Sequence, residues 1–283
     1  MKHNRKVLNE GGNAIKTSIP IKKEYLDKSL QYVYSEFLPA LKVKKSDTAL
    51  LGSTGKKPVS GDIDFAIDIK PIIKNNNNIQ TIQDVINFIE DKANSFFDEV
   101  VVLKGLDVIS VGLPIVGEKN QVAQLDIMPT DNLNFSTWMY YSPSEIESKY
   151  KGLYRNCLLS MILREGLGLD IRKRIGDTPV EWERYYIDFA KGLMKIIQSK
   201  EGKDGKILKN HKTIKTVPVT KDPDTIIGML FSDNVSVKDV ITFDGMLQAL
   251  KNSDRYKGVY SNIIEGTKEC ILQKGYPIPE EIN

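Results

Sequence analysis

The spacing of hydrophobic and polar positions changes several times along the first part of the chain, and each spacing predicts a different element. Apolar side chains recur every three or four residues over 22–43, which predicts an amphipathic helix whose end is perturbed by Pro39. A short apolar run over 48–53 ends in small residues. Residues 61–69 alternate strictly, which predicts a strand that buries its isoleucine and phenylalanine side chains and turns its aspartates to the other face.

A second helix and three more strands complete this half of the chain. Residues 81–97 have the pattern of a helix, with Thr81 as the N-cap and Asp84 three residues later. The order helix, strand, strand, helix and three strands predicts the α+β class, with a mixed sheet and flanking helices. The three strand-like runs cover residues 98–103, 107–116 and 121–129.

Beyond the last of these strands the pattern changes. Residues 131–141 are aromatic and irregular, and residues 142–145 combine an N-cap serine, a first-turn proline and a capping-box glutamate. They predict a helix that runs from there to Gly166. The stretch 180–220 predicts a small strand-rich unit, and Asp222–Pro223 opens a last set of helices. We therefore expect three parts: a flexible arm over 1–20, an α+β domain over 21–135, and a smaller strand-and-helix domain over 136–283.

The composition is that of an ordinary globular protein. The chain has 283 residues, of which 41% are hydrophobic and 27% are charged, so it can form one large or two modest domains. Its formal net charge is only +3, so a nucleic-acid-binding surface would have to come from local clustering of basic residues. Cys157 and Cys270 are far apart in the sequence, and we expect two buried free thiols in a reducing compartment.

The residue inventory argues against several classes of function. No apolar run is long enough to cross a bilayer, and no apolar stretch follows the basic N-terminus as it would in a signal peptide. We expect a cytoplasmic protein without a membrane partner, in the host cytoplasm if the source is viral. The two histidines, His3 and His211, argue against a histidine dyad and against a zinc site built on histidines.

The candidate chemistry lies between Leu50 and Phe65. A strand that ends in Gly52–Ser53 brings backbone N–H groups and a hydroxyl close to whatever lies above it, because glycine lets the chain approach. The loop that follows carries Lys56 and Lys57 among small residues. These lysines suit a polyanion such as a triphosphate, and they equally fit a solvated loop tip.

Two aspartates begin the next strand. Its alternation puts Asp62 and Asp64 on one face, about 7 Å apart along the chain. Two carboxylates this close repel each other when they are dry, and a pair of divalent cations is the usual resolution. Mg²⁺ takes such oxygens together with substrate phosphates. An isolated pair of this kind also fits two solvent-facing carboxylates at the start of a strand.

Gly52–Ser53, an interval of eight residues, and Asp62-Ile63-Asp64 together resemble the signature of the DNA polymerase β-type nucleotidyltransferase superfamily. This superfamily includes CCA-adding enzymes, poly(A) polymerases and oligoadenylate synthetases. The resemblance covers about residues 22–130. In such folds a third carboxylate comes from a later, neighbouring strand, and Asp126 fits because it lies opposite the apolar face of its strand.

The resemblance implies a role for each of these residues. Gly52 and Ser53 would bind the triphosphate of an NTP. Asp62 and Asp64 would ligate two Mg²⁺ or Mn²⁺ ions, and Asp126 would ligate the ion that activates the acceptor hydroxyl. The implied reaction is attack of that hydroxyl on the α-phosphorus, with pyrophosphate as the leaving group.

Several residues outside this motif have two interpretations. Asp107 and Asp131 are rival third carboxylates, although both are expected in turns or loops, and Asp68 is expected to be merely exposed. One aromatic cluster could stack a base or pack a domain junction. One basic group could meet phosphates or form an ordinary charged helix face. The aromatic cluster consists of Phe135, Trp138, Tyr140 and Tyr141, and the basic group of Lys149, Lys151 and Arg155.

A basic stretch in the second half bears on the acceptor. The stretch from Lys191 to Lys221 contains nine lysines and only two acidic residues. This surplus favours RNA or DNA as the partner, and it equally fits a strand edge that lysines protect from aggregation. We expect a nucleic-acid 3′ end as the acceptor. The alternatives are a protein or small-molecule acceptor, or a catalytically idle protein that serves as a binding module. Four lysines recur at every third position, so a regular strand would send them alternately to its two faces: Lys206, Lys209, Lys212 and Lys215.

Overall fold

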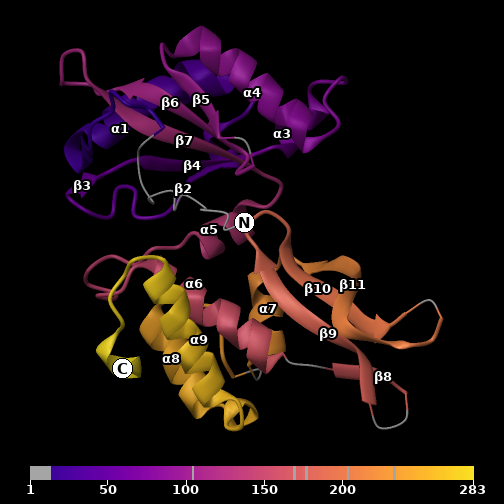
Figure 1. Ribbon diagram of the computed structural model, residues 1–283. Helices are drawn as coiled ribbons and strands as arrows, with labels where there is room; N and C mark the ends of the chain where they lie inside the picture. Colours follow the sequence, from indigo (N-terminus) through magenta and orange to yellow (C-terminus); the bar gives the residue numbers. More distant parts are fainter. Residues whose placement is uncertain (1–13, 104, 168–169, 176–177, 203, 232–233) are drawn as a thin grey trace. The chain divides into compact units, whose positions relative to one another are not determined.

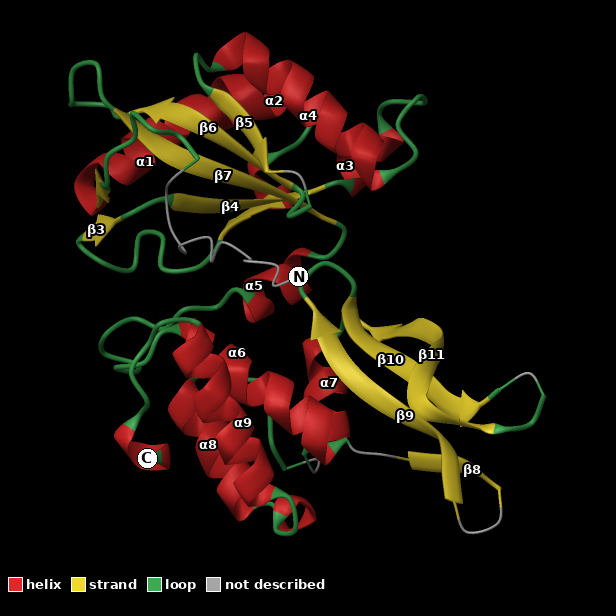
Figure 2. Cartoon of the chain, viewed as in Figure 1, coloured by secondary structure: helices red, strands yellow, loops and turns green. Residues whose placement is uncertain are grey.

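The computed structural model divides the chain into two compact units, one ending at Leu133 and the other beginning at Asn134 (Figure 1). Both units combine helices with a β-sheet, which confirms the α+β class (Figure 2). The described residues are 14–103, 105–167, 170–175, 178–202, 204–231 and 234–283.

The first unit is built on a five-stranded sheet with the order β2-β4-β7-β6-β5. Strands β4 and β7 run parallel and the other neighbours run antiparallel, so the sheet is mixed, as predicted. A separate two-stranded ladder joins β1 (Ile21–Lys22) to β3 (Val59–Ser60). The strands of the large sheet are β2 (Thr48–Leu50), β4 (Ile63–Asp68), β5 (Val100–Leu103), β6 (Val108–Pro114) and β7 (Val122–Thr130).

Helices cover one face of this sheet, where Ile63, Phe65 and Ile67 are fully buried in a common core with helical side chains. Thr81 caps its helix as predicted: its hydroxyl accepts from the N–H of Asp84, whose carboxylate accepts from the N–H of Thr81. The helices are α1 (Lys23–Tyr32), a π-helical turn (Val33–Phe37), α2 (Leu38–Ala40), a 3₁₀ turn (Lys45–Asp47), α3 (Lys70–Lys74) and α4 (Ile82–Phe96).

The segment predicted to be a flexible arm over 1–20 is described only in part. Residues 1–13 lie outside the described residues, but residues 14–20 are attached to β7. Ile15 is buried, and the N–H of Ile19 donates to the carbonyl of Val122 at 2.9 Å. The sequence prediction missed this attachment because it depends on hydrogen bonds to the backbone and to a side chain of a strand more than a hundred residues away.

The second unit contains a four-stranded antiparallel sheet with the order β11-β10-β9-β8, and a helical core. Both the strand-rich stretch and the helix opened by Asp222 were predicted; the Asp222 side chain accepts from the N–H of Thr225. The strands are β8 (Asp170–Ile175), β9 (Thr178–Asp188), β10 (Gly192–Glu201) and β11 (Ile207–Thr220). The helices are α5 (Leu133–Met139), α6 (Gly152–Met161), a π-helical turn (Ile162–Gly166), α7 (Pro223–Leu230), α8 (Phe243–Asn252), α9 (Tyr260–Gln273) and 3₁₀ turns at Asp254–Tyr256 and Glu280–Ile282.

Three local predictions in this unit are wrong. The irregular segment contains the short helix α5, and the helix predicted to begin at Ser142 begins at Gly152. The hydroxyl and N–H of Ser144 bond to the carboxylate of Glu147 instead of starting a helix, so this segment folds as a loop. The two cysteines are not free thiols, because Cys157 on α6 and Cys270 on α9 form a disulfide with their Cα atoms 5.8 Å apart.

Candidate active site

Three carboxylates meet at one place in the first unit. Asp62, Asp64 and Asp126 each offer one oxygen atom, and these atoms lie within 4.8 Å of one another. All three side chains are partly exposed. In the part of the chain that the structure describes, no other group of acidic, histidine or cysteine side chains is arranged in this way, so the site could hold a metal ion.

Strand pairing brings the three residues together. Asp64 on β4 lies directly beside Asp126 on β7 in the parallel ladder, and Asp126 lies opposite Ser110 on β6. Paired residues share a face of the sheet, so these side chains lie opposite the face that Ile63 and Phe65 bury under the helices. Asp62 stands two positions before Asp64, which directs it to the same face.

The loop that follows β2 closes tightly over Asp64. The N–H of Leu51 donates to the Asp64 carbonyl at 2.9 Å, and the N–H of Asp64 donates to the Thr54 hydroxyl at 3.0 Å. Gly52 has a φ of +59°, and a Cβ atom at this position would clash with the Asp64 carboxylate. Glycine is therefore required there both by its conformation and by the closeness of the carboxylate.

The closeness of three carboxylates shapes the electrostatics of the site. Burial, and after it the nearby charges of Asp62 and Asp126, together raise the pKa of Asp64 from 3.8 to about 7. A divalent cation would remove this repulsion, and oxygen ligands are those that Mg²⁺ and Mn²⁺ prefer. The donor set therefore fits the ions that the sequence predicts.

Two polar side chains hold the Asp126 carboxylate. The hydroxyl of Ser110 donates to Oδ1 at 2.5 Å, and Nε2 of Gln124 donates to Oδ1 at 2.9 Å and to Oδ2 at 3.0 Å. Gln124 is only 2% exposed, and its Oε1 accepts from the N–H groups of Ala14 and Ile15, both at 3.0 Å. One buried amide therefore connects the N-terminal segment with the third carboxylate.

Sequence reasoning missed Thr54, Ser110 and Gln124. A signal for two of them was present: Ser110 interrupts an apolar strand, and Gln124 stands two positions before Asp126, which puts both on the face of the carboxylate. Their partners could not be predicted, because the contacts of Ser110 and Gln124 cross between strands or reach the N-terminal segment.

The predicted nucleotide-binding loop is well ordered by its own contacts. The N–H of Lys56 donates to the Ser53 carbonyl at 3.1 Å, and the N–H of Gly55 donates to the buried Ser60 hydroxyl at 3.3 Å. The Lys56 side chain is exposed and that of Lys57 is half-buried. Their phosphate-binding role remains a prediction.

The other acidic and aromatic residues that the sequence singled out have separate positions in the structure. Asp107 and Asp131 are exposed, whereas Asp68, at the far end of β4, is half-buried; all three lie outside the cluster. Phe135 and Trp138 are buried in the core of the second unit with their ring centroids 6.0 Å apart, so for these two the packing interpretation holds.

The basic group beyond the domain boundary does not form one charged face. Arg155 is fully buried, and its guanidinium donates to the carbonyl of Met139 and stacks 5.0 Å from the Trp138 ring centroid. Lys149 is exposed but forms an ion pair with Glu281 at 2.9 Å.

The four lysines of the basic stretch lie at or near the outer strand of the second sheet. Lys206 precedes β11 and lies 3.5 Å from Asp204, and the other three are exposed on β11. The expectation that a regular strand alternates them is wrong for one pair. Lys212 pairs with Ser199 and Lys215 with Ile197, across an irregularity in the ladder, so both lie on one face.

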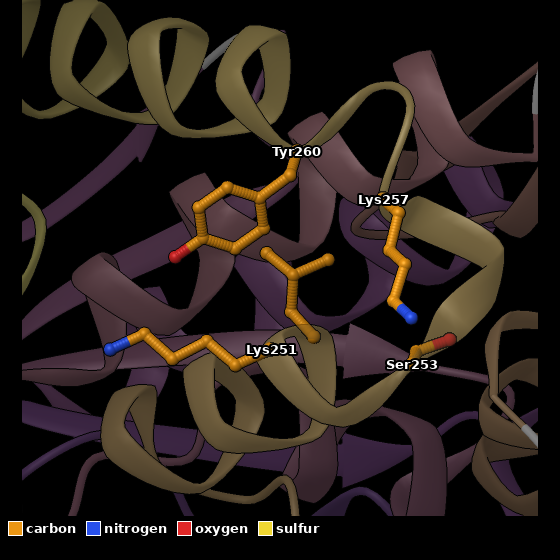
Figure 3. A pocket seen from close by; sticks show the side chains of 5 residues that line it. Lys251, Ser253, Lys257 and Tyr260 are labelled. Carbon is orange, nitrogen blue, oxygen red and sulfur yellow. The ribbon is translucent and has the colours of Figure 1, made fainter.

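A surface hollow of about 290 Å³ lies in the second unit, and its lining contains no carboxylate cluster like that of the first unit (Figure 3). It lies between α8 and α9, where Lys251 and Lys257 extend to opposite ends of it. Lys257 already pairs with Asp254 at 2.7 Å. The polar groups that line the hollow do not converge on one point, so the hollow is not assigned a function.

Comparisons with known proteins add a distant likeness. No protein family and no curated protein matches the sequence. Two crystal structures of polymerase beta from Leishmania infantum resemble the chain: a ternary P/T complex at 10% identity, covering 94% of this chain and 77% of that one, and a ternary gap complex at 9%, covering 93% and 70%. The TM-score is 0.37 in both cases, so the chemistry has to be judged from the site itself.

Among the described residues, no helix is long and apolar enough to span a membrane.

Proposed function

We propose that the protein is a metal-dependent nucleotidyltransferase that transfers a nucleoside monophosphate from an NTP to a hydroxyl acceptor. The observation that carries this proposal is the cluster of Asp62, Asp64 and Asp126 on one face of the sheet, with the Gly52 turn closed over Asp64. The sequence motif predicted this arrangement from the same residues.

The reaction forms one bond and breaks one. The acceptor oxygen bonds to the α-phosphorus of the NTP, the bond from that phosphorus to pyrophosphate breaks, and the hydroxyl proton is released. Bound divalent cations would supply Lewis-acid stabilisation of the attacking and leaving oxygens. Asp62 and Asp64 would hold two such ions, and Asp126 would hold the one on the acceptor side.

The surrounding residues have positioning tasks in this scheme. Ser110 and Gln124 fix the orientation of the Asp126 carboxylate through its hydrogen bonds. A carboxylate accepts about four hydrogen bonds or ligands, so these contacts leave room for a cation. Gly52 lets the loop approach Asp64, where the backbone and the Ser53 hydroxyl would meet the triphosphate.

The acceptor that we favour is a nucleic-acid 3′ end, RNA or DNA. What supports it is the surplus of lysine on and near β11, where Lys209, Lys212 and Lys215 are exposed. Lysines that meet phosphates release counterions, which makes the binding depend on salt.

The test is incubation of the protein with each labelled NTP, Mg²⁺ or Mn²⁺, and a panel of RNA, DNA and protein acceptors. Asp62→Asn and Asp64→Asn should each abolish transfer, whereas Asp68→Asn, on the same strand outside the cluster, should retain it. Asp126→Ala should lose turnover and keep NTP binding, because it is assigned to the acceptor side. Substantial transfer by either of the first two variants would refute the assignment.

A further inference from the structure

A basic hollow of about 410 Å³ lies in the first unit, apart from the carboxylate cluster. Thr48 on β2 pairs with Ile67 on β4 in an antiparallel ladder, so the segment that leads into β2 lies beside the segment that follows β4. Both segments contribute charged residues to the hollow. These residues are Lys42, Lys44, Asp47, Asp68, Lys70 and Lys74.

The two carboxylates of the hollow are engaged by the protein backbone. Asp47 accepts from the N–H of Lys44 at 3.0 Å, and Asp68 accepts from the N–H of Lys70 at 2.9 Å. Both aspartates therefore shape the local turns. They carry two negative charges against the four positive charges of the lysines, which leaves the hollow with a surplus of positive charge.

The lysines differ in what they contact. The ammonium group of Lys42 donates to the carbonyl of Asn75 at 2.9 Å and so stabilises the turn after α3. Lys44, Lys70 and Lys74 are exposed, and none of them forms an ion pair with an acidic side chain among the residues that the structure describes. Three ammonium groups are therefore available to an anion.

The hollow and the carboxylate cluster share one face of β4. Asp68 stands four positions after Asp64 on this strand, so their side chains point to the same face about 13 Å apart. This distance equals the rise of about four stacked nucleotides, at about 3.4 Å for each nucleotide of a strand. A triphosphate held at Asp62 and Asp64 is too short to extend this far along the strand.

We propose that Lys44, Lys70 and Lys74 bind backbone phosphates of a polynucleotide acceptor whose 3′ end lies at Asp126. This inference rests on the proposed function and names its substrate class. The ammonium groups act as point charges toward phosphate, which gives affinity without sequence preference. The acceptor strand then runs along β4 from the hollow to the carboxylates.

The test is a triple variant, Lys44→Gln, Lys70→Gln and Lys74→Gln, with Lys42 retained because it supports a turn. Binding of a fluorescein-labelled single-stranded RNA or DNA oligonucleotide is measured by anisotropy across a series of KCl concentrations. Each lost phosphate contact lowers the slope of log affinity against log salt by about 0.7 for a single strand, so we expect the slope to fall by about 2. Affinity for the NTP should remain at the wild-type level.

Two matched variants carry the same loss of charge elsewhere. Replacing Lys22, Lys23 and Lys28 with Gln, on and beside α1, should leave the slope unchanged. Replacing Lys209, Lys212 and Lys215 on β11 with Gln measures separately the contribution of the lysines that support the proposed acceptor class. Thermal denaturation of all three variants checks the fold, which the exchange of exposed side chains should preserve.

The outcomes separate this inference from the proposed function. A wild-type slope for the hollow variant overturns the inference, and so does an equal decrease in the α1 variant. Weakened NTP binding without a change in slope overturns it as well, because the hollow would then hold the triphosphate. Loss of transfer in Asp64→Asn supports the proposed function whatever the slopes are, and absence of transfer by the wild-type protein with every acceptor refutes it.

Discussion

Removing one charge from the acidic cluster should stabilise the protein when no metal is present. The pKa of Asp64 is raised from 3.8 to about 7, so the folded state binds a proton more tightly than the unfolded chain does. Stability of the wild-type protein is therefore lost as the pH rises from about 4 to about 7. Each unit of pKa corresponds to about 1.4 kcal/mol, so the full shift is worth about 4 kcal/mol.

Solvent reaches part of the cluster and screens it, which lowers the expected effect to roughly 2–4 kcal/mol. Asp64→Asn has no charge to lose, so its free energy of unfolding should exceed that of the wild type by this amount above pH 7. The two proteins should be nearly equal below about pH 3, where Asp64 is protonated in both the folded and the unfolded state.

The assay is urea denaturation in EDTA at a series of pH values, with Asp68→Asn as the control for the substitution itself. Saturating Mg²⁺ should then stabilise the wild type more than the variant, because an ion that binds only the folded state adds to its stability. The reasoning fails if Asp64→Asn is no more stable than the wild type above pH 7, or if its advantage is the same at every pH.

Two further changes test how the site is held. Gln124→Met removes the donor to both oxygens of Asp126 and leaves two backbone N–H groups of the N-terminal segment unpaired. It should lower the free energy of unfolding by about 1–3 kcal/mol and weaken Mn²⁺ binding measured by calorimetry. Unchanged values would exclude the link between the N-terminal segment and Asp126. Gly52→Ala forces a left-handed conformation on alanine, which costs about 1–2 kcal/mol, and pushes the Asp64 carboxylate aside. The affinity for Mn²⁺ should therefore fall. In the control Gly61→Ala, the added methyl group meets open space, and the affinity for Mn²⁺ should stay unchanged.

The sequence alone was sufficient for the strands of the first sheet and for the placement of Asp62 and Asp64 on one face. Strict alternation over 61–69 determines which side chains are buried, because a strand has a period of two. That period also put Asp62 and Asp64 on one face, opposite Ile63 and Phe65. The N-cap at Thr81 could be predicted equally well, because the capping box is formed by residues three positions apart.

Tertiary structure decided what these elements touch. Asp126 lies beside Asp64 only because β4 and β7 pair in parallel with this register, and Gln124 meets the N-terminal segment only in the folded chain. The hollow at Lys44 depends likewise on the antiparallel pairing of β2 with β4.

The wrong predictions have the same cause. The disulfide of Cys157 joins residues 113 positions apart, and the irregularity in β11 that turns Lys212 and Lys215 to one face is visible only against its partner strand. Local patterns determine the period, the burial and the caps of single elements, because these depend on residues a few positions apart. Register, long-range pairing and the meeting of distant side chains depend on contacts across the fold, and the tertiary structure alone specifies them.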